Sequence, residues 1–571
     1  MNKTLLRHLA LAVALCALVC GVSHAAEEAK AGAGEKLTWR TPRGVEFVVG
    51  AGGLELIRSG ERDVAKGGWT AWNADGWFKN AGSGKVKLKT AREKTCEKLA
   101  DDRARVRHVY EDAACSFEYS FAGEDCTISA RIENNHAGEA LAVTGFSGLK
   151  FFFDKPPAGY MQVQHISYFQ AHGAGLCHPG HWSKIGGSYA TDNTIGVGTS
   201  PSRTGLMRTL TLWDYADWNP DKREKLPQRN LLYFAVSTIP PRGAQTFDFK
   251  LRVSPERDWK HLLTPYREHF QATFGEAQYK ADFRWIATDY LNHSQQAISP
   301  QNPYGFHGGP RRIDTPEGAK AFCDTLIPPL QAANGQGVIV WGQGGDDPRG
   351  GMYRPDFDIL PPEVETNWAT LQQRFKDAGL KLGVCTRPRD MAVRLNWKSD
   401  QIISINPDDP GHCEMLWKRF KTMMDKGCTL FYLDSFGSSF EDVKLMRYLR
   451  AKMGPDILTY CEHQCDAIMP YSGAYSETTL DAEGDPAKAH YGVWSGMENW
   501  DIYRWLVPGA QLASRLYQVK GKPPEGFESP EHFFYGHHIT PLVPSSDSKR
   551  MPPLKSTQPE FVDEKGQWKQ Q

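Results

Sequence analysis

The chain has 571 residues, and its 67 Lys and Arg balance 67 Asp and Glu, so the formal net charge at pH 7 is zero. This balance gives no electrostatic reason to expect nucleic acid or an anionic membrane as a partner. The length leaves room for more than one domain with a hydrophobic core.

The first 25 residues have the pattern of a secretory signal peptide. Lys3 and Arg7 precede an apolar segment, Leu9 to Val22, and Ser23-His24-Ala25 offers a small-x-small cleavage site. No later stretch is apolar for long enough to span a bilayer. We therefore expect a protein that is secreted or periplasmic and has no membrane contact after cleavage.

Ten of the twelve cysteines follow this segment, and export permits disulfides. Cys96, Cys115 and Cys126 are close enough in a strand-rich region for one pair to bridge. Spacing leaves the pairing open.

Residues 36–256 consist of short segments with alternating apolar and polar residues, separated by Gly, Asn, Asp and Pro. The clearest are Val45 to Val49, Phe117 to Phe121, Thr127 to Ile132 and Phe247 to Leu251. Such alternation indicates half-buried antiparallel strands, and their number predicts a β-sandwich. A linker, 257–280, follows, and apolar residues recur in it from Arg257 to Phe274 at helical spacing.

Residues 281–548 change to a repeated order of strand, loop and helix. The expected strands are Phe283 to Thr288, Val338 to Trp341, Leu380 to Thr386, Thr429 to Leu433, Ile457 to Cys461, Ala467 to Pro470, Trp505 to Ala510 and Ile539 to Val543. Parallel βαβ units of this number close most economically into a barrel. The predicted fold class is thus an α/β TIM barrel preceded by an all-β sandwich domain, with a polar tail at 549–571.

The helices between these strands have recognisable ends. Thr315-Pro316-Glu317 and Asp409-Pro410 are helix starts, and Ser438-x-x-Glu441 predicts a capping box. The apolar stripe that begins at Val364 ends at Gly379, a residue suited to the helix C-terminus.

Carboxylates follow several of the strands, at the end of a barrel where active sites lie. They are Asp289, Asp346, Asp347, Asp390, Asp434 and Glu462. Glycoside hydrolysis needs two carboxylates, and neighbouring strands about 4.8 Å apart bring them near the roughly 5 to 5.5 Å of retaining enzymes. Asp434 and Glu462 fit this spacing. The alternative is that Asp434 only caps its loop or the helix near Ser438.

Three segments carry a family resemblance: Ile403-Ser404-Ile405-Asn406-Pro407, Gly427 to Asp434, and Thr459-Tyr460-Cys461-Glu462-His463. With this architecture, the chain resembles retaining barrel glycosidases with an N-terminal β-sandwich, namely the clan D α-galactosidases and the family 101 and 129 α-N-acetylgalactosaminidases. It departs from clan D in having no room for a C-terminal β-domain. The resemblance implies that Asp434 is the nucleophile and that the acid/base is Glu462, after the fifth strand, or Glu477, at a sixth-strand position. We favour Glu462 because it ends a recognisable strand, and keep Glu477 as the reserve.

The remaining residues at the strand ends suit substrate binding by hydrogen bonds or ring stacking. They are Asp289, Trp341, Asp346, Asp347, Arg387, Arg389, Asp390 and His463. No cofactor or metal is expected, since Cys461, His463 and Cys465 lack a fourth ligand. The sequence thus predicts an exported glycosidase acting on an oligo- or polysaccharide. A catalytically inactive saccharide-binding barrel, or a polysaccharide lyase with a base near Arg387, are the alternatives.

Overall fold

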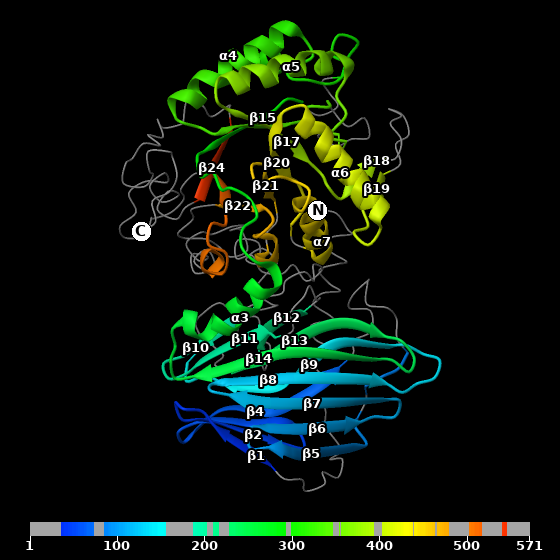
Figure 1. The fold of residues 1–571 in the computed structure, drawn as a ribbon, viewed down its shortest axis with the longest axis vertical. Coiled ribbons are helices and arrows are strands. Elements are labelled where there is room, and N and C mark those ends of the chain that lie inside the picture. The colour runs from blue at the N-terminus through cyan, green and yellow to red at the C-terminus, as the bar shows by residue number, and fades with distance from the viewer. Residues whose placement is uncertain are drawn as a thin grey trace. The chain divides into compact units, whose positions relative to one another are not determined.

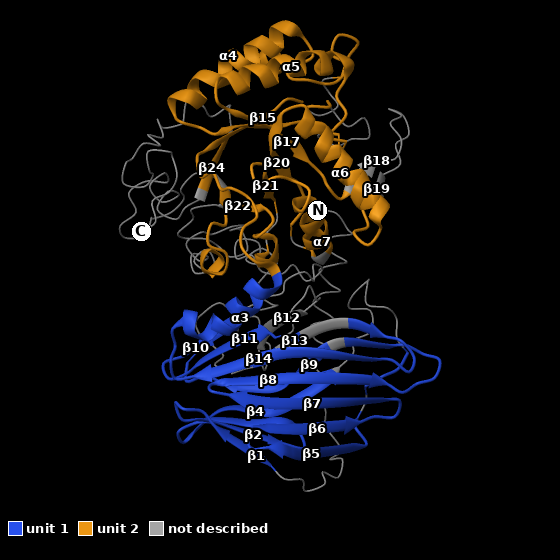
Figure 2. Ribbon diagram, in the orientation of Figure 1, with its two compact units in different colours: residues 1–165, 185–273 blue, residues 166–184, 274–571 orange. Residues whose placement is uncertain are grey.

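The structure is a computed structural model of the chain. The residues that it describes are 36–72, 85–88, 90–155, 187–202, 209–215, 228–292, 298–345, 353–354, 356–392, 402–437, 439–462, 465–478, 502–516 and 539–544. The predicted signal peptide and polar tail lie outside these ranges. The chain divides into two compact units, 1–165 with 185–273 and 166–184 with 274–571 (Figure 2).

The first unit contains two antiparallel sheets, each of seven described strands (Figure 1). One sheet has the order β1 (Leu37–Arg40), β2 (Val45–Gly50), β3 (Gly53–Ser59), β4 (Arg62–Trp72), β9 (Leu141–Phe152), β13 (Gln228–Ile239) and β12 (Thr209–Tyr215). The other has the order β10 (Ser188–Thr191), β11 (Gly196–Pro201), β14 (Ala244–Ser254), β8 (Asp125–Asn134), β7 (Ala113–Ala122), β6 (Arg103–Val109) and β5 (Glu93–Ala100).

Strand alternation builds the sandwich core. In β8, residues Cys126, Ile128, Ala130 and Ile132 are all fully buried, while the residues between them are more exposed. Aromatic rings from both sheets meet at Phe146 of β9, which lies 5.8 Å from Phe117 and 6.0 Å from Phe249 between ring centroids. Large rings bury the most apolar area per residue, so this cluster anchors the two sheets to each other.

The helix predicted in the linker is α3 (Trp259–Phe274), which packs against the second sheet. The backbone of Leu262 comes so close to Gly198 that a Cβ at that position would lie 2.0 Å from the Leu262 carbonyl oxygen. Ser200 also donates a hydrogen bond to the Pro265 carbonyl at 3.2 Å. Glycine at position 198 therefore allows the helix to approach the sheet.

The second unit is a closed barrel of eight parallel strands (Figure 1). In order they are β15 (Ile286–Tyr290), β16 (Gly337–Trp341), β17 (Lys381–Thr386), β20 (Cys428–Leu433), β21 (Leu458–Cys461), β22 (Gly473–Thr478), β23 (Leu512–Leu516) and β24 (Ile539–Pro544). Parallel pairing of β15 with β24 closes the ring. The predicted fold class, a TIM barrel preceded by a β-sandwich, is confirmed.

The described helices of this unit are α4 (Pro316–Ala332), α5 (Pro362–Asp377), α6 (Pro410–Asp425) and α7 (Phe440–Arg450), with short 3-10 helices η3 (Gly309–Arg311) and η4 (Asp466–Ile468). A small antiparallel pair, β18 (Asp390–Ala392) with β19 (Ile402–Ser404), extends the loop after β17. Thr315 and Asp409 cap α4 and α6 as predicted, because their side chains accept hydrogen bonds from the first-turn amides. In α5 the predicted stripe, which includes Trp368 and Phe375, is buried.

Two of the predicted barrel strands are wrong. The apolar run Ala467 to Pro470 overlaps the 3-10 helix η4, and the sixth strand is β22. The run Trp505 to Ala510 begins in a short helical segment, 502–506, and the seventh strand is β23. Short apolar runs are buried in both helices and strands, so burial alone does not separate the two.

Two local predictions also need correction. The capping box of α7 is formed by Ser439 and Asp442, one residue later than Ser438 and Glu441. All described cysteines are free thiols, including Cys96, Cys115 and Cys126, so none of these three bridges another. Among the described residues, no helix is long and apolar enough to cross a membrane.

Candidate active site

Asp434 follows the last residue of β20, at the carboxyl end of the barrel strands. Its backbone amide donates to the Thr386 carbonyl of β17 at 2.8 Å, and the Glu462 amide donates to the Leu433 carbonyl at 3.0 Å. Asp434 and Glu462 each lie two residues beyond a buried tyrosine of the barrel interior, Tyr432 and Tyr460. Since strand side chains alternate, both carboxyls lie above the interior core of the barrel.

Three side chains donate hydrogen bonds to the Asp434 carboxylate. Tyr353 donates its hydroxyl hydrogen to Oδ2, and Arg387 Nε reaches the same oxygen at 2.9 Å. Ser435 Oγ lies 3.2 Å from Oδ1. Oδ2 is therefore held by a phenol and a guanidinium. Of these three donors, only the Ser435 hydroxyl reaches Oδ1.

Ser435 connects Asp434 to the second carboxylate. It has a φ of 55°, a left-handed conformation that is uncommon for a residue other than glycine. In this conformation its backbone amide donates to Glu462 Oε2 at 2.5 Å. Unusual backbone angles of this kind gather at functional sites, where the surrounding contacts maintain them.

The pKa of Asp434 lies below its ordinary value, although Asp434 is mostly buried. Burial alone would raise this pKa, but hydrogen bonds with Glu462, Tyr353 and Arg387 outweigh the effect of burial. Asp434 is therefore ionised near neutral pH. Glu462, which follows the next barrel strand, thus contributes to the low pKa of Asp434.

Aromatic rings form the barrel interior below these carboxyls. Tyr290 stacks on Trp341 with 5.1 Å between ring centroids, Trp341 lies 4.9 Å from Tyr432, and Tyr432 lies 5.2 Å from Tyr475. Trp341 is 7% exposed, whereas Tyr290 is 37% exposed and covers one face of it. The solvent-facing ring of this cluster is therefore Tyr290, a residue not predicted from the sequence.

The predicted binding residues near β17 have different partners. Arg387 contacts Asp434, as described. Arg389 contacts Ser439 and reaches Asp442 at 2.5 Å, so it is tied to the capping box of α7.

The predicted binding residue on β15 also has a partner. Asp289 accepts a hydrogen bond from Arg311 at 2.7 Å and has the opposite strand parity to Ile286, which belongs to the barrel interior. Both Arg389 and Asp289 are thus engaged by structural partners.

The remaining predicted site residues are Asp346, Asp347, Asp390, His463 and Glu477. Asp346, Asp347 and His463 lie outside the described residues. For Asp390 and Glu477 only the backbone is described: Asp390 begins β18, and Glu477 lies in β22 in register with Arg515. Their roles stay predictions.

Sequence reasoning missed Tyr353, which comes from the segment between β16 and α5 and is 3% exposed. It is separated from Asp434 by 81 residues, and no local pattern marks it. The available signal was weak: an aromatic residue beside Arg354 and Asp356 in a polar loop.

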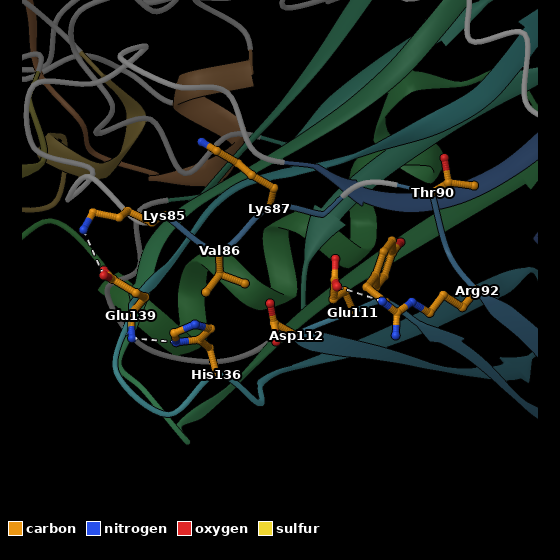
Figure 3. A pocket seen from close by; sticks show the side chains of 10 residues that line it. Lys85, Val86, Lys87, Thr90, Arg92, Glu111, Asp112, His136 and Glu139 are labelled. Carbon is orange, nitrogen blue, oxygen red and sulfur yellow. Dashed lines mark hydrogen bonds and ion pairs between the residues drawn. The ribbon is translucent and has the colours of Figure 1, made fainter.

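No group of three or more metal-ligating side chains occurs among the described residues. A separate hollow of about 420 Å³ lies in the first unit, lined in part by Lys87, Thr90, Tyr110 and His136 (Figure 3). Two ion pairs border it, Lys85 with Glu139 and Arg92 with Glu111, both at 2.9 Å. The opposite charges there compensate one another. We therefore favour the barrel end over this hollow as the functional site.

The chain matches no known family model and no curated protein. It is similar in structure to several glycosidases. An α-galactosidase of family GH36 from Geobacillus stearothermophilus is 9% identical, with 90% of this chain and 85% of that chain covered and a TM-score of 0.42. An α-galactosidase from Thermus thermophilus is 11% identical, with 79% and 90% covered and a TM-score of 0.42.

A third similar structure is a GH31 sulfoquinovosidase from E. rectale, 11% identical, with 89% of this chain and 76% of that chain covered and a TM-score of 0.48. At this level of similarity the activity has to be inferred from the residues of this chain.

Proposed function

We propose that the protein is an exported retaining glycoside hydrolase that acts on an oligo- or polysaccharide, with Asp434 as the nucleophile. The observation that carries the proposal is the environment of Asp434. An ionised carboxylate stands at the end of the fourth barrel strand, with one oxygen held by Tyr353 and Arg387 and a second carboxyl, Glu462, beside it. This is the pair of groups that glycoside hydrolysis requires.

In the first step, a lone pair of an Asp434 oxygen attacks the anomeric carbon. The bond from that carbon to the leaving oxygen breaks, its electron pair stays on the oxygen, and the acid/base supplies a proton. In the second step, water attacks the same carbon and gives its proton to the acid/base. The ester bond to Asp434 then breaks and restores the carboxylate.

Two residues are candidates for the acid/base. Glu462 ends the fifth strand and lies beside Asp434, which supports the sequence prediction. The ends of neighbouring strands are about 4.8 Å apart, which is near the roughly 5 to 5.5 Å separation of the carboxyls in retaining pairs. Glu477 is one strand further along the barrel and has the same strand parity as the interior residue Tyr475, which supports it as the reserve.

The sugar would lie over the aromatic rings at the strand ends. The apolar face of a pyranose stacks on aromatic side chains, and the exposed ring is that of Tyr290 rather than Trp341. Binding residues predicted from the sequence, Arg387 and the loop residues Asp346 and Asp347, would add hydrogen bonds to hydroxyl groups.

A polysaccharide lyase would need a base near Arg387. Tyr353 is the aromatic hydroxyl there, with the Arg387 guanidinium 4.5 Å from its ring centroid. Burial raises the pKa of Tyr353 far above its ordinary range, and the nearby Cys385 and Asp434 raise it further. A phenol in this state is a poor base, which weighs against the lyase.

The test compares Asp434→Asn, Glu462→Gln and Glu477→Gln on aryl α- and β-glycosides, including galactosides and N-acetylgalactosaminides, after each variant is shown to be folded. Asp434→Asn should lose at least about 1,000-fold in kcat, since it removes the nucleophile. Azide should rescue only the acid/base variant. Full activity of Asp434→Asn would refute the mechanism, and a folded wild type that binds sugars without cleaving any would identify a saccharide-binding barrel.

A further inference from the structure

Tyr353 is buried at the point where the barrel end meets the segment before α5. Its hydroxyl donates to Asp434 Oδ2 and accepts a hydrogen bond from Cys385 Sγ at 3.3 Å. The Arg387 guanidinium covers its ring at 4.5 Å. The phenol is thus enclosed by Cys385 of β17 and by Arg387, which follows β17, and it points its hydrogen at the carboxylate.

A buried charge network holds the residues that follow Tyr353. Asp356 is 1% exposed and accepts hydrogen bonds from Arg354 at 3.1 Å and from Arg419 of α6 at 3.2 Å. A second acid, Asp358, lies 3.7 Å from Arg419. Such charges are expensive to separate once buried, so the network fixes this segment to α6.

Apolar and backbone contacts fix the same segment from other sides. The Phe357 ring lies 4.9 Å from Phe420 of α6, and Gln343 donates to the Phe357 carbonyl at 3.0 Å. The Arg354 amide also reaches the Gly345 carbonyl at 3.4 Å. Tyr353 is consequently held in place by a rigid support rather than by its hydrogen bond to Asp434 alone.

We infer that Tyr353 is a positioning residue for the nucleophile: its hydroxyl fixes Asp434 Oδ2, so that Oδ1 is the oxygen that attacks the sugar. This inference rests on the proposed function. With Oδ2 occupied by Tyr353 and Arg387, rotation of the carboxylate would break two hydrogen bonds. The neutral phenol keeps its proton throughout both steps, and it continues to donate to Oδ2 when that atom becomes the carbonyl oxygen of the glycosyl ester.

The groups that face Asp434 come from four parts of the barrel. They are Tyr353 before α5, Cys385 at the end of β17 with Arg387 just after it, Ser435 after β20, and Glu462 after β21. Of these, Tyr353 and Arg387 stabilise the ionised form directly through hydrogen bonds to Oδ2. Removal of the Tyr353 hydroxyl should therefore raise the pKa of Asp434.

The test is Tyr353→Phe, which keeps the ring and removes the donor. A matched control is Tyr448→Phe, which removes a tyrosine hydrogen bond to Glu414 at 2.9 Å between α7 and α6. We expect Tyr353→Phe to lower kcat about 10- to 100-fold with little change in KM, and to move the acid limb of the kcat/KM profile to higher pH. The control should match the wild type in kcat and in the pH profile.

A second variant should shift the acid limb of the pH profile in the opposite direction. Site-specific 3,5-difluorotyrosine at position 353 makes the hydroxyl a stronger donor, so the acid limb should move to lower pH. It preserves the size of the side chain closely, which keeps the test informative if Tyr353→Phe fails to fold. Unchanged pH profiles and kcat in the folded variants would overturn the inference.

A measurement without turnover separates this inference from the proposed function. Carbodiimide labels the protonated form of a carboxyl, and peptide mass spectrometry reports the labelling of Asp434 as pH varies. In Tyr353→Phe the labelling should extend to higher pH, whether or not a substrate is known. If labelling in Tyr353→Phe follows the same pH dependence as in the wild type, the role of Tyr353 is refuted. If the labelling shifts but Asp434→Asn keeps full activity, only the glycosidase mechanism is refuted.

Discussion

Replacing Asp356 by Asn should destabilise the barrel unit because it breaks the buried charge network. Asp356 is 1% exposed and pairs with Arg354, whose side chain is 4% exposed, and Arg419, whose side chain is 11% exposed. Asp358 lies 3.7 Å from Arg419 in the same network. The variant removes one negative charge from beside two guanidinium groups that are mostly shielded from water.

Loss of one partner of a buried ion pair costs about 3 to 5 kcal/mol of unfolding free energy. Because Asp358 remains near Arg419, we expect the lower part of this range, about 3 kcal/mol. For a unit of this size that corresponds to a fall in melting temperature of roughly 6 °C. Differential scanning calorimetry measures it and can resolve the transitions of the two units.

The matched control is Asp456→Asn in the same unit. Asp456 pairs with Lys280 at 2.7 Å, but the two side chains are 73% and 71% exposed. An exposed pair contributes only about 0 to 1 kcal/mol. Equal melting temperatures for Asp356→Asn and Asp456→Asn would refute the reasoning from burial.

Three further predictions concern stability. Burial lowers the pKa of His269 to about 4, so the unfolded chain binds more protons below pH 6.5. The contribution of His269 to the free energy of unfolding should therefore fall by about 3 kcal/mol as the pH drops toward 4. In urea unfolding at several pH values, His269→Phe should remove this contribution and leave the similar one of His108. Gln511→Leu should cost about 2 to 4 kcal/mol by calorimetry, because it deprives Tyr460, Thr540 and the Asp282 backbone of a buried partner. Ser435 has a φ of 55°, which a β-branched side chain adopts with strain, so Ser435→Val should lower the free energy of unfolding by about 1 to 3 kcal/mol. Ser435→Gly should be neutral or stabilising in thermal melts.

Each of these three has a clear opposing result. His269→Phe with the pH dependence of the wild type would mean that another group senses acid. Gln511→Leu with wild-type stability would show that the polar groups at the opposite end of the barrel reach water. Equal melting temperatures for Ser435→Val and Ser435→Gly would exclude backbone strain at this position.

The sequence by itself determined most of the element order. Alternation in segments such as Thr127 to Ile132 predicted sandwich strands, and the cap signals at Thr315 and Asp409 predicted helix starts that the structure confirms. These features depend on neighbours along the chain, so a local pattern specifies them. The position of Asp434 after the fourth barrel strand was predicted for the same reason.

Local patterns failed where two readings were equally good. Ser438-x-x-Glu441 and Ser439-x-x-Asp442 both fit a capping box, and the structure forms the second, in which Asp442 also pairs with Arg389 of another segment. The apolar run Ala467 to Pro470 fits a strand or a buried turn equally well. For the capping box, the contact with Arg389 favours the form that the structure shows.

Only the tertiary structure decided which side chains meet at the end of the barrel. Closure of the eight strands brings Glu462 and Arg387 to Asp434, and the segment before α5 adds Tyr353 from 81 residues away. The sequence could supply a carboxylate at a strand end, but the donors that keep it ionised and oriented come from other βα units. Their convergence depends on barrel geometry and buried packing, which no local pattern encodes.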